Sequence, residues 1–381
     1  MACRKPRILH IYKDYFPPVR GGIENTINLM ARGCSDEFDV SVLVCAGSSI
    51  PGVTVIDNVR VVRVPEIIRA WSAPFAPAFV SALRREASAA DILHFHHPNP
   101  TGDVAYLLSR VRKPYVITYH SDVVRQRAAM ALYGYIQNRM MQSAQVIMPT
   151  SPNYIESSPW LRRYKSRCHV VPLGISLKRF EPLPEILDAA KQLRSRYPGP
   201  IVTFVGRLRY YKGIHFLIEA MLSVPATLLI IGTGPEMSNL QNLVHTLGLA
   251  NKVQFLGDVD DENLVRYLYA TDVFCLPSHL RSEAFGICQI EAMACGVPVV
   301  STALATGVPF VNVHGETGVI VPPANPRALA EALSQLLSND EYRRSLGEKA
   351  KQRAHTYFSA ERMVSDIKNI YHQVLATSSS E

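Results

Sequence analysis

Short apolar runs alternate with helical stretches along both halves of this 381-residue chain, and this alternation restricts the fold more than any other feature. The first run, Arg7–Ile11, leads through a proline-containing loop to Gly21 and Gly22, after which a helical pattern begins. The same order restarts at Ile201–Val205. A strand, a glycine turn and a helix open a doubly wound parallel sheet, in which ligands bind at the carboxyl ends of the strands. The sequence therefore predicts an α/β protein with two Rossmann-like doubly wound domains.

Further strand-like runs, rich in β-branched and aromatic residues, complete each half. They are 39–45, 53–56, 59–64, 92–95, 115–119, 145–149 and a final strand and turn at 170–175 in the first half, and 227–231, 253–256, 273–276, 298–301 and 319–321 in the second. The proline-containing connection 178–184 suggests an N-terminal domain of residues 1–180 and a C-terminal domain of residues 181–357. An amphipathic helix at about 358–376 is expected to pack back on the first domain.

The net charge of +8 is concentrated in the first half of the chain, where residues 1–180 carry 23 Lys and Arg against 12 Asp and Glu. This excess suggests an anionic partner, either nucleic acid or a membrane surface with its lipid-diphosphate acceptors. Within this half, the segment 67–85 combines Trp71, Phe75 and Phe79 with three arginines. We expect it either to lie on a membrane interface or to form a loop packed on its domain.

Two further patterns bear on the cellular compartment. No apolar run approaches the roughly 18 residues that a membrane-spanning helix needs, and Lys13 and Asp14 break the N-terminal apolar run, unlike a secretory signal. The seven cysteines are scattered without a C-x-x-C pair, which favours reduced core thiols over disulfides or a zinc site. We therefore expect a cytoplasmic protein.

The stretch 282–296 predicts a ligand site. Its apolar spacing and the stop at Gly296 indicate a short helix that begins near Gly286, with Glu283 in the preceding loop and Glu291 about one turn inside. Free N–H groups and the helix dipole would bind an anion, while each carboxylate would accept hydrogen bonds from hydroxyl groups. A nucleotide-sugar, with phosphate between two polyhydroxylated ends, satisfies both demands. Alternatively, Glu283 only complements the helix dipole and Glu291 is a surface residue.

Three other side chains follow predicted strands. Arg207 and Lys212 flank the loop after the strand 201–205, where both can converge on a diphosphate. His120 follows the strand 115–119 and would face the ligand crevice, close to a substrate hydroxyl or a developing charge. A purely structural histidine is the alternative at that position.

Taken together, these motifs resemble the retaining glycosyltransferases of family 4, also called group 1, which have the GT-B fold. The resemblance implies two Rossmann-like domains facing a cleft, with the donor held mainly by the second domain, the acceptor by the first, and a C-terminal helix crossing back to the first. It is carried by Gly21-Gly22, His120, Pro172-Leu173-Gly174-Ile175, Val205-Gly206-Arg207-Leu208, Lys212-Gly213, Gly232-Thr233-Gly234-Pro235, Glu283-Ala284-Phe285-Gly286-Ile287 with Glu291, and Gly315-Glu316-Thr317-Gly318.

The resemblance also implies a role for each motif residue. Arg207 and Lys212 would bind the diphosphate and stabilise the leaving charge. Glu283 would hold sugar hydroxyls, Glu291 the ribose, and His120 the sugar near its reacting carbon. Contacts to phosphate, sugar or base are further expected from Gly21, Gly22, Val259, Asp260, Phe285, Gly286 and Ile287, and contacts to the acceptor from Asp122 and Arg125. No cofactor or divalent metal is expected, because basic side chains and a helix N-terminus neutralise the diphosphate.

Among family members, the chain looks most similar to bacterial mannosyltransferases that build O-antigen or other surface polysaccharide. This similarity implies transfer of mannose from GDP-mannose to a glycan or lipid-diphosphate-linked acceptor, with no nucleic-acid partner, at the cytoplasmic face of the inner membrane. A UDP-hexose donor is the alternative within the family. A sugar-nucleotide epimerase and a nonenzymatic sugar-nucleotide-binding protein are alternatives of other classes.

Overall fold

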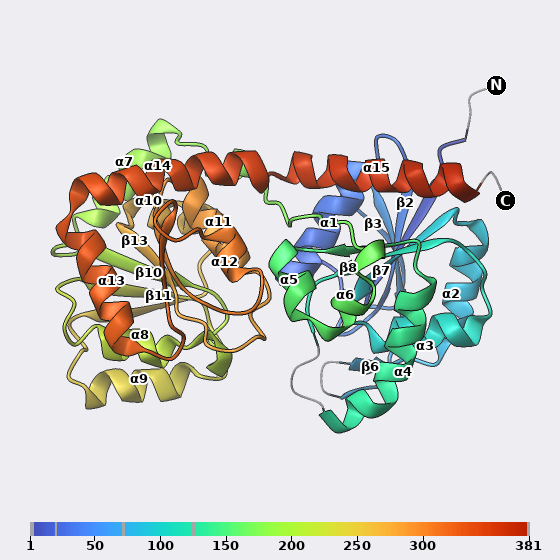
Figure 1. Ribbon diagram of the computed structural model, residues 1–381, viewed down its shortest axis with the longest axis horizontal. Coiled ribbons are helices and arrows are strands. Elements are labelled where there is room, and N and C mark those ends of the chain that lie inside the picture. The colour runs from blue at the N-terminus through green and yellow to red at the C-terminus, as the bar shows by residue number, and fades with distance from the viewer. Residues whose placement is uncertain (1–3, 20, 71–72, 123–126, 379–381) are drawn as a thin grey trace. The chain divides into compact units, whose positions relative to one another are not determined.

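The computed structural model describes residues 4–19, 21–70, 73–122 and 127–378, which form two compact units (Figure 1). The first unit is Met1–Gly174 together with Ala360–Glu381, and the second is Ile175–Ser359. Each unit is built around one mainly parallel sheet whose strands are connected by helices. The prediction of an α/β chain with two doubly wound halves is therefore confirmed.

The first unit contains a seven-stranded sheet of order β3-β4-β2-β1-β7-β8-β9, in which only the β3–β4 pair is antiparallel. A separate two-stranded sheet pairs β5 with β6. The strands are β1 (Arg7–Ile11), β2 (Asp39–Cys45), β3 (Gly52–Ile56), β4 (Val59–Val64), β5 (Ile68–Ala70), β6 (Ala73–Phe75), β7 (Ile92–His97), β8 (Tyr115–Tyr119) and β9 (Val146–Pro149). The helices are α1 (Gly22–Cys34), α2 (Ala78–Ala89), α3 (Pro100–Ser109), α4 (Arg127–Ser143), α5 (Pro152–Ser157), α6 (Pro159–Arg163), the 3₁₀ turn η1 (Lys165–Arg167) and α15 (Ala360–Ser378).

The second unit contains a six-stranded, fully parallel sheet of order β12-β11-β10-β13-β14-β15. Its strands are β10 (Ile201–Val205), β11 (Thr227–Ile231), β12 (Val253–Gly257), β13 (Val273–Leu276), β14 (Val299–Thr302) and β15 (Gly318–Val321). Its helices are η2 (Leu177–Phe180), α7 (Pro184–Arg194), η3 (Tyr210–Lys212), α8 (Ile214–Ala220), α9 (Met237–Thr246), α10 (Asp261–Ala270), α11 (Ile287–Ala294), α12 (Val308–Val311), α13 (Pro326–Ser338) and α14 (Asp340–Tyr357).

The central strands read as continuous apolar runs because helices cover both faces of a parallel sheet. Every residue of β11 and β13 is buried. The strand β7 is equally buried but carries three histidines among its six residues, His94, His96 and His97. Buried polar side chains need hydrogen-bond partners, so β7 differs in kind from the other core strands.

Both sheets have a point at which the strand order reverses. In the first unit the chain builds β2 and β4 on one side of β1 and then β7, β8 and β9 on the other. In the second unit it builds β11 and β12 on one side of β10 and then β13, β14 and β15 on the other. The loops that leave the two strands at such a point diverge, which leaves room for a ligand at the carboxyl ends of the strands.

The observed boundary between the units lies at Gly174, whereas the sequence predicted it at residue 180. The 3₁₀ turn η2 packs on the second unit, because the Tyr269 hydroxyl donates a hydrogen bond to the Phe180 carbonyl.

The predicted strand at 170–175 is wrong. His169 and Val171 donate single backbone hydrogen bonds beside β9, but Pro172 has no N–H group to continue a ladder.

The C-terminal helix α15 packs on the first unit, beside α1 and β7, as predicted (Figure 1). Its Ile367, Ile370 and Tyr371 side chains are fully buried, and the Tyr371 ring meets Phe38 edge-on at a centroid distance of 5.4 Å. On its outer side, Lys368 forms ion pairs with Asp36 and Glu37.

The segment 67–85 forms the β5–β6 hairpin and the start of α2. Phe79 is buried in the core, whereas Ile67, Ile68 and Phe75 are exposed. Trp71 lies outside the described residues. Among the helices in the described part of the chain, none combines the length and the apolar content that crossing a membrane requires.

The packing of α15 can be tested by substitution. Ile367→Ala should lower the unfolding free energy of the first unit by about 2–5 kcal/mol, because it removes buried methyl groups and leaves a cavity. Lys368→Ala, one residue later, should cost at most about 1 kcal/mol, because its partners are largely exposed to solvent. Urea unfolding followed by circular dichroism measures both variants. Equal losses in the two would contradict the assignment of the buried face.

Candidate functional site

The second unit brings together side chains from the loops on both sides of its reversal point. Lys212 ends η3 in the loop after β10, and Glu283 lies between β13 and α11. These strands are adjacent and parallel, so their carboxyl ends lie at the same edge of the sheet. Two residues that are far apart in the sequence therefore meet at the expected ligand position.

Lys212 and Glu283 form an ion pair in which Nζ lies 2.5 Å from Oε2, and their side chains are only 10% and 9% exposed. The Ser278 hydroxyl donates a second hydrogen bond to the same carboxylate oxygen, at 2.9 Å. Burial lowers the pKa of Lys212, but the Glu283 carboxylate, together with Cys288 and Tyr211, raises it by more, so the net shift of this pKa is upward. Lys212 is therefore a fixed cation at neutral pH.

The backbone at Gly213 allows this approach. Gly213 has a positive φ of 67°, and a Cβ atom there would lie 2.2 Å from the carbonyl oxygen of Pro277. Any other residue would collide with the segment that follows β13. The His279 amide also donates a hydrogen bond to the Tyr211 carbonyl at 3.0 Å. These contacts hold the lysine loop against the glutamate loop.

The helix α11 begins at Ile287, four residues after Glu283, with Gly286 as its N-cap at φ 76°. This agrees with the helix start and the loop position of Glu283 predicted from the sequence. Among the described residues, the backbone N–H groups of Gly286, Ile287 and Cys288 have no acceptor. Unpaired N–H groups and the helix dipole attract an anion. Phe285, by contrast, buries its side chain and meets the Phe358 ring edge-on.

Glu291 lies one turn inside α11, as predicted, and has no hydrogen-bond partner among the described residues. Burial raises the pKa of its carboxyl group to about 7. The Arg179 guanidinium of η2 lowers this pKa, and the Asp261 carboxylate at the start of α10 raises it. Glu291 is thus a partly protonated carboxyl group that has oxygens available for ligand hydroxyls.

Arg207 is exposed and has no partner in the described part of the chain. Its neighbour Gly206 brings the backbone close to Lys212, because a Cβ at Gly206 would lie 3.5 Å from the lysine Nζ. The structure therefore places both basic residues on one loop. Lys212 is fixed by its carboxylate partner, whereas the guanidinium of Arg207 is free to bind an anion.

Val259 and Asp260 line a surface cavity of about 410 Å³ beside α7 and α10. The Asp260 carboxylate caps α10 by accepting hydrogen bonds from the Asn263 backbone amide and side chain at 2.8 and 2.7 Å. These bonds lower the pKa of Asp260. None of the other predicted site residues that the structure describes lines this cavity.

In the first unit, Gly21 and Gly22 lie where the loop after β1 enters α1, at that sheet's reversal point, and Gly22 is the first residue of the helix. Gly21 is the N-cap of α1, and a Cβ there would lie 2.2 Å from a carboxylate oxygen of Glu24. Burial raises the pKa of Glu24. A side chain at Gly21 would therefore displace a buried carboxyl group from the start of the helix.

His120 follows β8 and is buried, and its backbone amide donates a hydrogen bond to the His97 carbonyl at 3.0 Å. Its Nε2 lies 3.1 Å from Nδ1 of His96, whereas its own Nδ1 has no partner. Burial, reinforced by the neighbouring His97, lowers the pKa of His120 to about 3. The ring is therefore neutral at physiological pH, with one nitrogen unused.

Of the two predicted acceptor residues, the structure describes Asp122 but not Arg125. The Asp122 carboxylate accepts hydrogen bonds from the hydroxyls of Tyr119 and Ser158, both at 2.7 Å, and its backbone amide donates to the Tyr154 hydroxyl at 2.8 Å. These bonds fix the chain just after His120. Arg125 lies outside the described residues.

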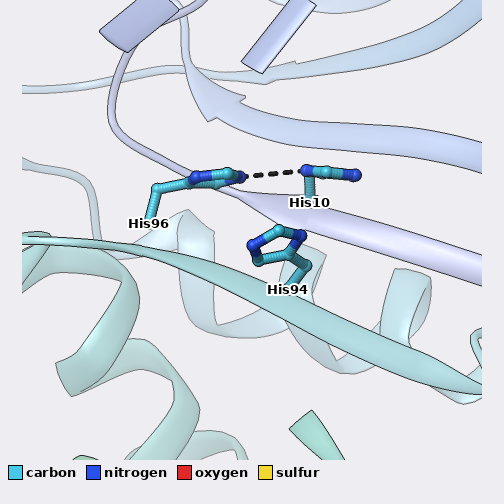
Figure 2. A group of neighbouring side chains, drawn as sticks. All are labelled: His10, His94 and His96. Carbon is cyan, nitrogen blue, oxygen red and sulfur yellow. Dashed lines mark hydrogen bonds between the residues drawn. The ribbon is translucent and has the colours of Figure 1, made fainter. Parts of the chain in front are cut away.

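The sequence analysis missed a group of buried histidines on neighbouring strands. His10 of β1 lies opposite His94 in the β1–β7 register, and His96 lies two residues further along the same face (Figure 2). One ring nitrogen from each of the three lies within 4.8 Å of the other two, as the ligands of a metal site would. The alternating histidines of the sequence His94-Phe95-His96 were the available signal, because alternate residues of a strand share a face.

Two sequence families match the chain. Residues 186–353 match the family described as "Glycosyl transferases group 1", and residues 21–174 match the "Glycosyl transferase 4-like domain". These two matches correspond closely to the two units of the structure.

Individual proteins are similar over nearly the whole chain. D-rhamnosyltransferase WbpZ of Pseudomonas aeruginosa is 35% identical over 356 residues, which cover 93% of this chain and 92% of the relative. O-antigen chain mannosyltransferase C of Escherichia coli is 31% identical over 374 residues, covering 98% and 100%. The solved structure of sucrose-phosphate synthase from Thermosynechococcus elongatus superimposes with a TM-score of 0.81 at 25% identity, covering 98% and 100%. The chain therefore belongs to the group 1 glycosyltransferases and has their GT-B fold.

Proposed function

We propose that this chain transfers mannose from GDP-mannose to a lipid-linked or polysaccharide acceptor in the synthesis of an O-antigen type of surface glycan. The proposal is supported by the 31% identity to an O-antigen chain mannosyltransferase that covers both proteins almost completely. The 35% identity to a D-rhamnosyltransferase supports a second candidate donor, a D-rhamnosyl nucleotide.

The observation that carries the proposal is the Lys212–Glu283 pair beside the unpaired N–H groups of α11. A nucleotide-sugar presents a diphosphate directly bonded to a ring with several hydroxyls. In our proposal Arg207, Lys212 and the helix N–H groups bind the diphosphate, and Glu283 accepts hydrogen bonds from the sugar. Glu291 accepts hydrogen bonds from the ribose, and His120 of the first unit contacts the transferred sugar.

The chemistry follows from where charge develops. Transfer breaks the bond between the anomeric carbon and the phosphate oxygen and forms a bond from that carbon to the acceptor oxygen. Negative charge grows on the departing diphosphate, so cations and N–H donors fixed beside it stabilise the transition state more than the bound donor. With retention of configuration, the acceptor approaches on the face that the phosphate leaves, and its hydroxyl proton passes to a phosphate oxygen.

We also propose that transfer needs no divalent metal, because Lys212, Arg207 and the α11 terminus supply the positive charge.

Location at the cytoplasmic face of a membrane belongs to the proposal as well. The basic first half of the sequence supports it, and so do the exposed Ile67, Ile68 and Phe75 of the segment around the β5–β6 hairpin. Anionic lipids attract basic segments, and exposed apolar residues can enter the interface.

The donor assignment is tested by binding and turnover. GDP should bind more tightly than UDP, and GDP-mannose should be turned over with a synthetic lipid-linked acceptor at the same rate with and without EDTA. A site that hydrogen-bonds the mannose 6-hydroxyl should reject the D-rhamnosyl donor, which lacks it, by about 10⁴-fold, whereas an apolar pocket discriminates only about 10–200-fold. Tighter binding of UDP would overturn the GDP assignment. Sugar conversion without acceptor would indicate an epimerase, and binding without any turnover would indicate a binding protein.

Removing either member of the ion pair should abolish most of the activity. Lys212→Ala and Glu283→Ala should each lower kcat by about 10²–10³-fold, because each removes a group proposed to act on the leaving diphosphate or the sugar. Lys191→Ala is the matched control, since Lys191 is an exposed lysine of the same unit. Near-ultraviolet circular dichroism checks folding. Folded variants with unchanged turnover would refute the site.

The raised pKa of Glu291 predicts a pH dependence. The neutral acid prevails below a pH of about 7, and the carboxylate that accepts two ribose hydroxyls prevails above it. GDP-mannose should therefore bind about tenfold more tightly at pH 8 than at pH 6, as the ionised fraction rises from about one tenth to nine tenths. Isothermal titration calorimetry measures this change. Glu291→Gln should bind weakly at both values, and a variant that kept the full pH dependence would assign it to another group.

A further inference from the structure

Six buried groups of the first unit form one continuous chain of hydrogen bonds. The chain runs from the Thr118 hydroxyl to Nε2 of His94 (2.7 Å), from Nδ1 of His94 to the Tyr371 hydroxyl (2.6 Å), from that hydroxyl to Nε2 of His10 (3.2 Å), from Nδ1 of His10 to Nε2 of His96 (2.9 Å), and from Nδ1 of His96 to Nε2 of His120 (3.1 Å). Figure 2 shows the His10–His96 link. The chain joins β1, β7 and β8 to the C-terminal helix α15.

The proton count of this chain restricts its arrangement. Burial lowers the pKa of His10, His94, His96 and His120, so each ring is neutral and carries a single N–H. Six groups with one hydrogen each are then joined by five links. All five links are made in three arrangements: every group donates towards His120, every group donates towards Thr118, or the Tyr371 hydroxyl accepts from both His94 and His10. The sixth hydrogen is then left on His120, Thr118 or Tyr371, respectively.

The three arrangements differ in which group carries the sixth hydrogen. When donation runs towards His120, Thr118 donates to His94, and the leftover hydrogen is on Nδ1 of His120. When donation runs the other way, Nδ1 of His120 is bare, and the buried Thr118 hydroxyl has a hydrogen but no acceptor among the described residues. When Tyr371 accepts both of its bonds, Nδ1 of His120 is again bare, and the buried Tyr371 hydrogen has no acceptor among those residues. A ligand oxygen at His120 selects the first arrangement, because it gives the leftover hydrogen a partner.

We propose that His10, His94, His96 and Tyr371 are positioning residues that hold His120 as its Nδ1–H tautomer, so that its unpaired nitrogen donates a hydrogen bond to a substrate oxygen. The tautomer follows from the hydrogen-bond chain once a ligand oxygen faces Nδ1 of His120. Its effect on transfer rests on the proposed contact between His120 and the sugar.

A metal ion on the same three histidines is the competing explanation. Their nitrogens are close enough, but all six nitrogens of His10, His94 and His96 already take part in the hydrogen-bond chain. An ion would have to break several of these bonds, and the group contains no carboxylate to balance its charge. The hydrogen-bond chain accounts for the observed position of every ring nitrogen of these three histidines without an ion.

The tautomer is measured directly by NMR of protein labelled with ¹⁵N-histidine, with the His120 signals assigned through their loss in His120→Gln. We expect the Nδ1–H form in wild-type protein with GDP-mannose bound. Tyr371→Phe removes the hydroxyl that links His94 to His10, so the Nε2–H form of His120 should become populated. Tyr115→Phe is the matched control, because its buried hydroxyl donates to the Met140 carbonyl and takes no part in the hydrogen-bond chain. It should leave His120 unchanged.

Kinetics separates this inference from the proposed function. Tyr371→Phe should lower kcat roughly tenfold with an unchanged KM for the acceptor, as expected when a catalytic histidine loses its orienting partner. An Nε2–H form in the wild type, an unchanged tautomer in folded Tyr371→Phe, or one stoichiometric equivalent of bound metal in the purified protein would overturn the proposal. A changed tautomer with wild-type turnover would overturn only its link to transfer. The wild-type spectrum decides the tautomer even if Tyr371→Phe fails to fold.

Discussion

The ion pair between Lys212 and Glu283 is the interaction around which the second unit arranges its site. Two charges with so little exposure are tolerated only when they satisfy each other, because removing either from water alone costs several kcal/mol. The pair therefore requires the loops after β10 and β13 to touch, and Gly213 makes that approach sterically possible. The same contact places the cation beside the start of α11. The need for charge balance thus fixes the geometry of the proposed phosphate site before any ligand binds.

The topology explains why this pair arises between residues so far apart in the sequence. In a doubly wound sheet, the loops at the reversal point are the ones that diverge, and each parallel strand delivers its following loop to the same edge. In the first unit, β1 and β7 flank the reversal, and the Gly21 turn lies there. Both units therefore have a reversal point in their sheets. The side chains near it are an ion pair in the second unit and neutral histidines in the first.

Most strands of both sheets and the position of α11 were predictable from the sequence, because the strands are short apolar runs and the helix has a clear stop at Gly296. The positions of Glu283 and Glu291 relative to that helix were predicted correctly for the same local reason. What could not be predicted depends on contacts between distant segments. Nothing in the local pattern pairs Lys212 with Glu283, and nothing shows that the interior of β7 is filled by a polar network with α15. The strand expected at 170–175 failed because Pro172 interrupts the ladder, a constraint that outweighs the apolar pattern.

The Lys212–Glu283 ion pair and the histidine hydrogen-bond chain differ in the charge that they carry. In the proposed complex, the diphosphate shares the Lys212 cation with Glu283, whose carboxylate has further lone pairs. One of these lone pairs can accept a hydrogen bond from a sugar hydroxyl, so one ion pair can bind both the anion and the sugar. The histidine chain carries no net charge, so it can be buried completely without a counter-ion. A neutral, directional donor suits a hydroxyl-rich sugar, because it orients an oxygen without competing for the diphosphate. Charge is thus kept where the leaving group departs, and neutral hydrogen bonds where the sugar is proposed to be held.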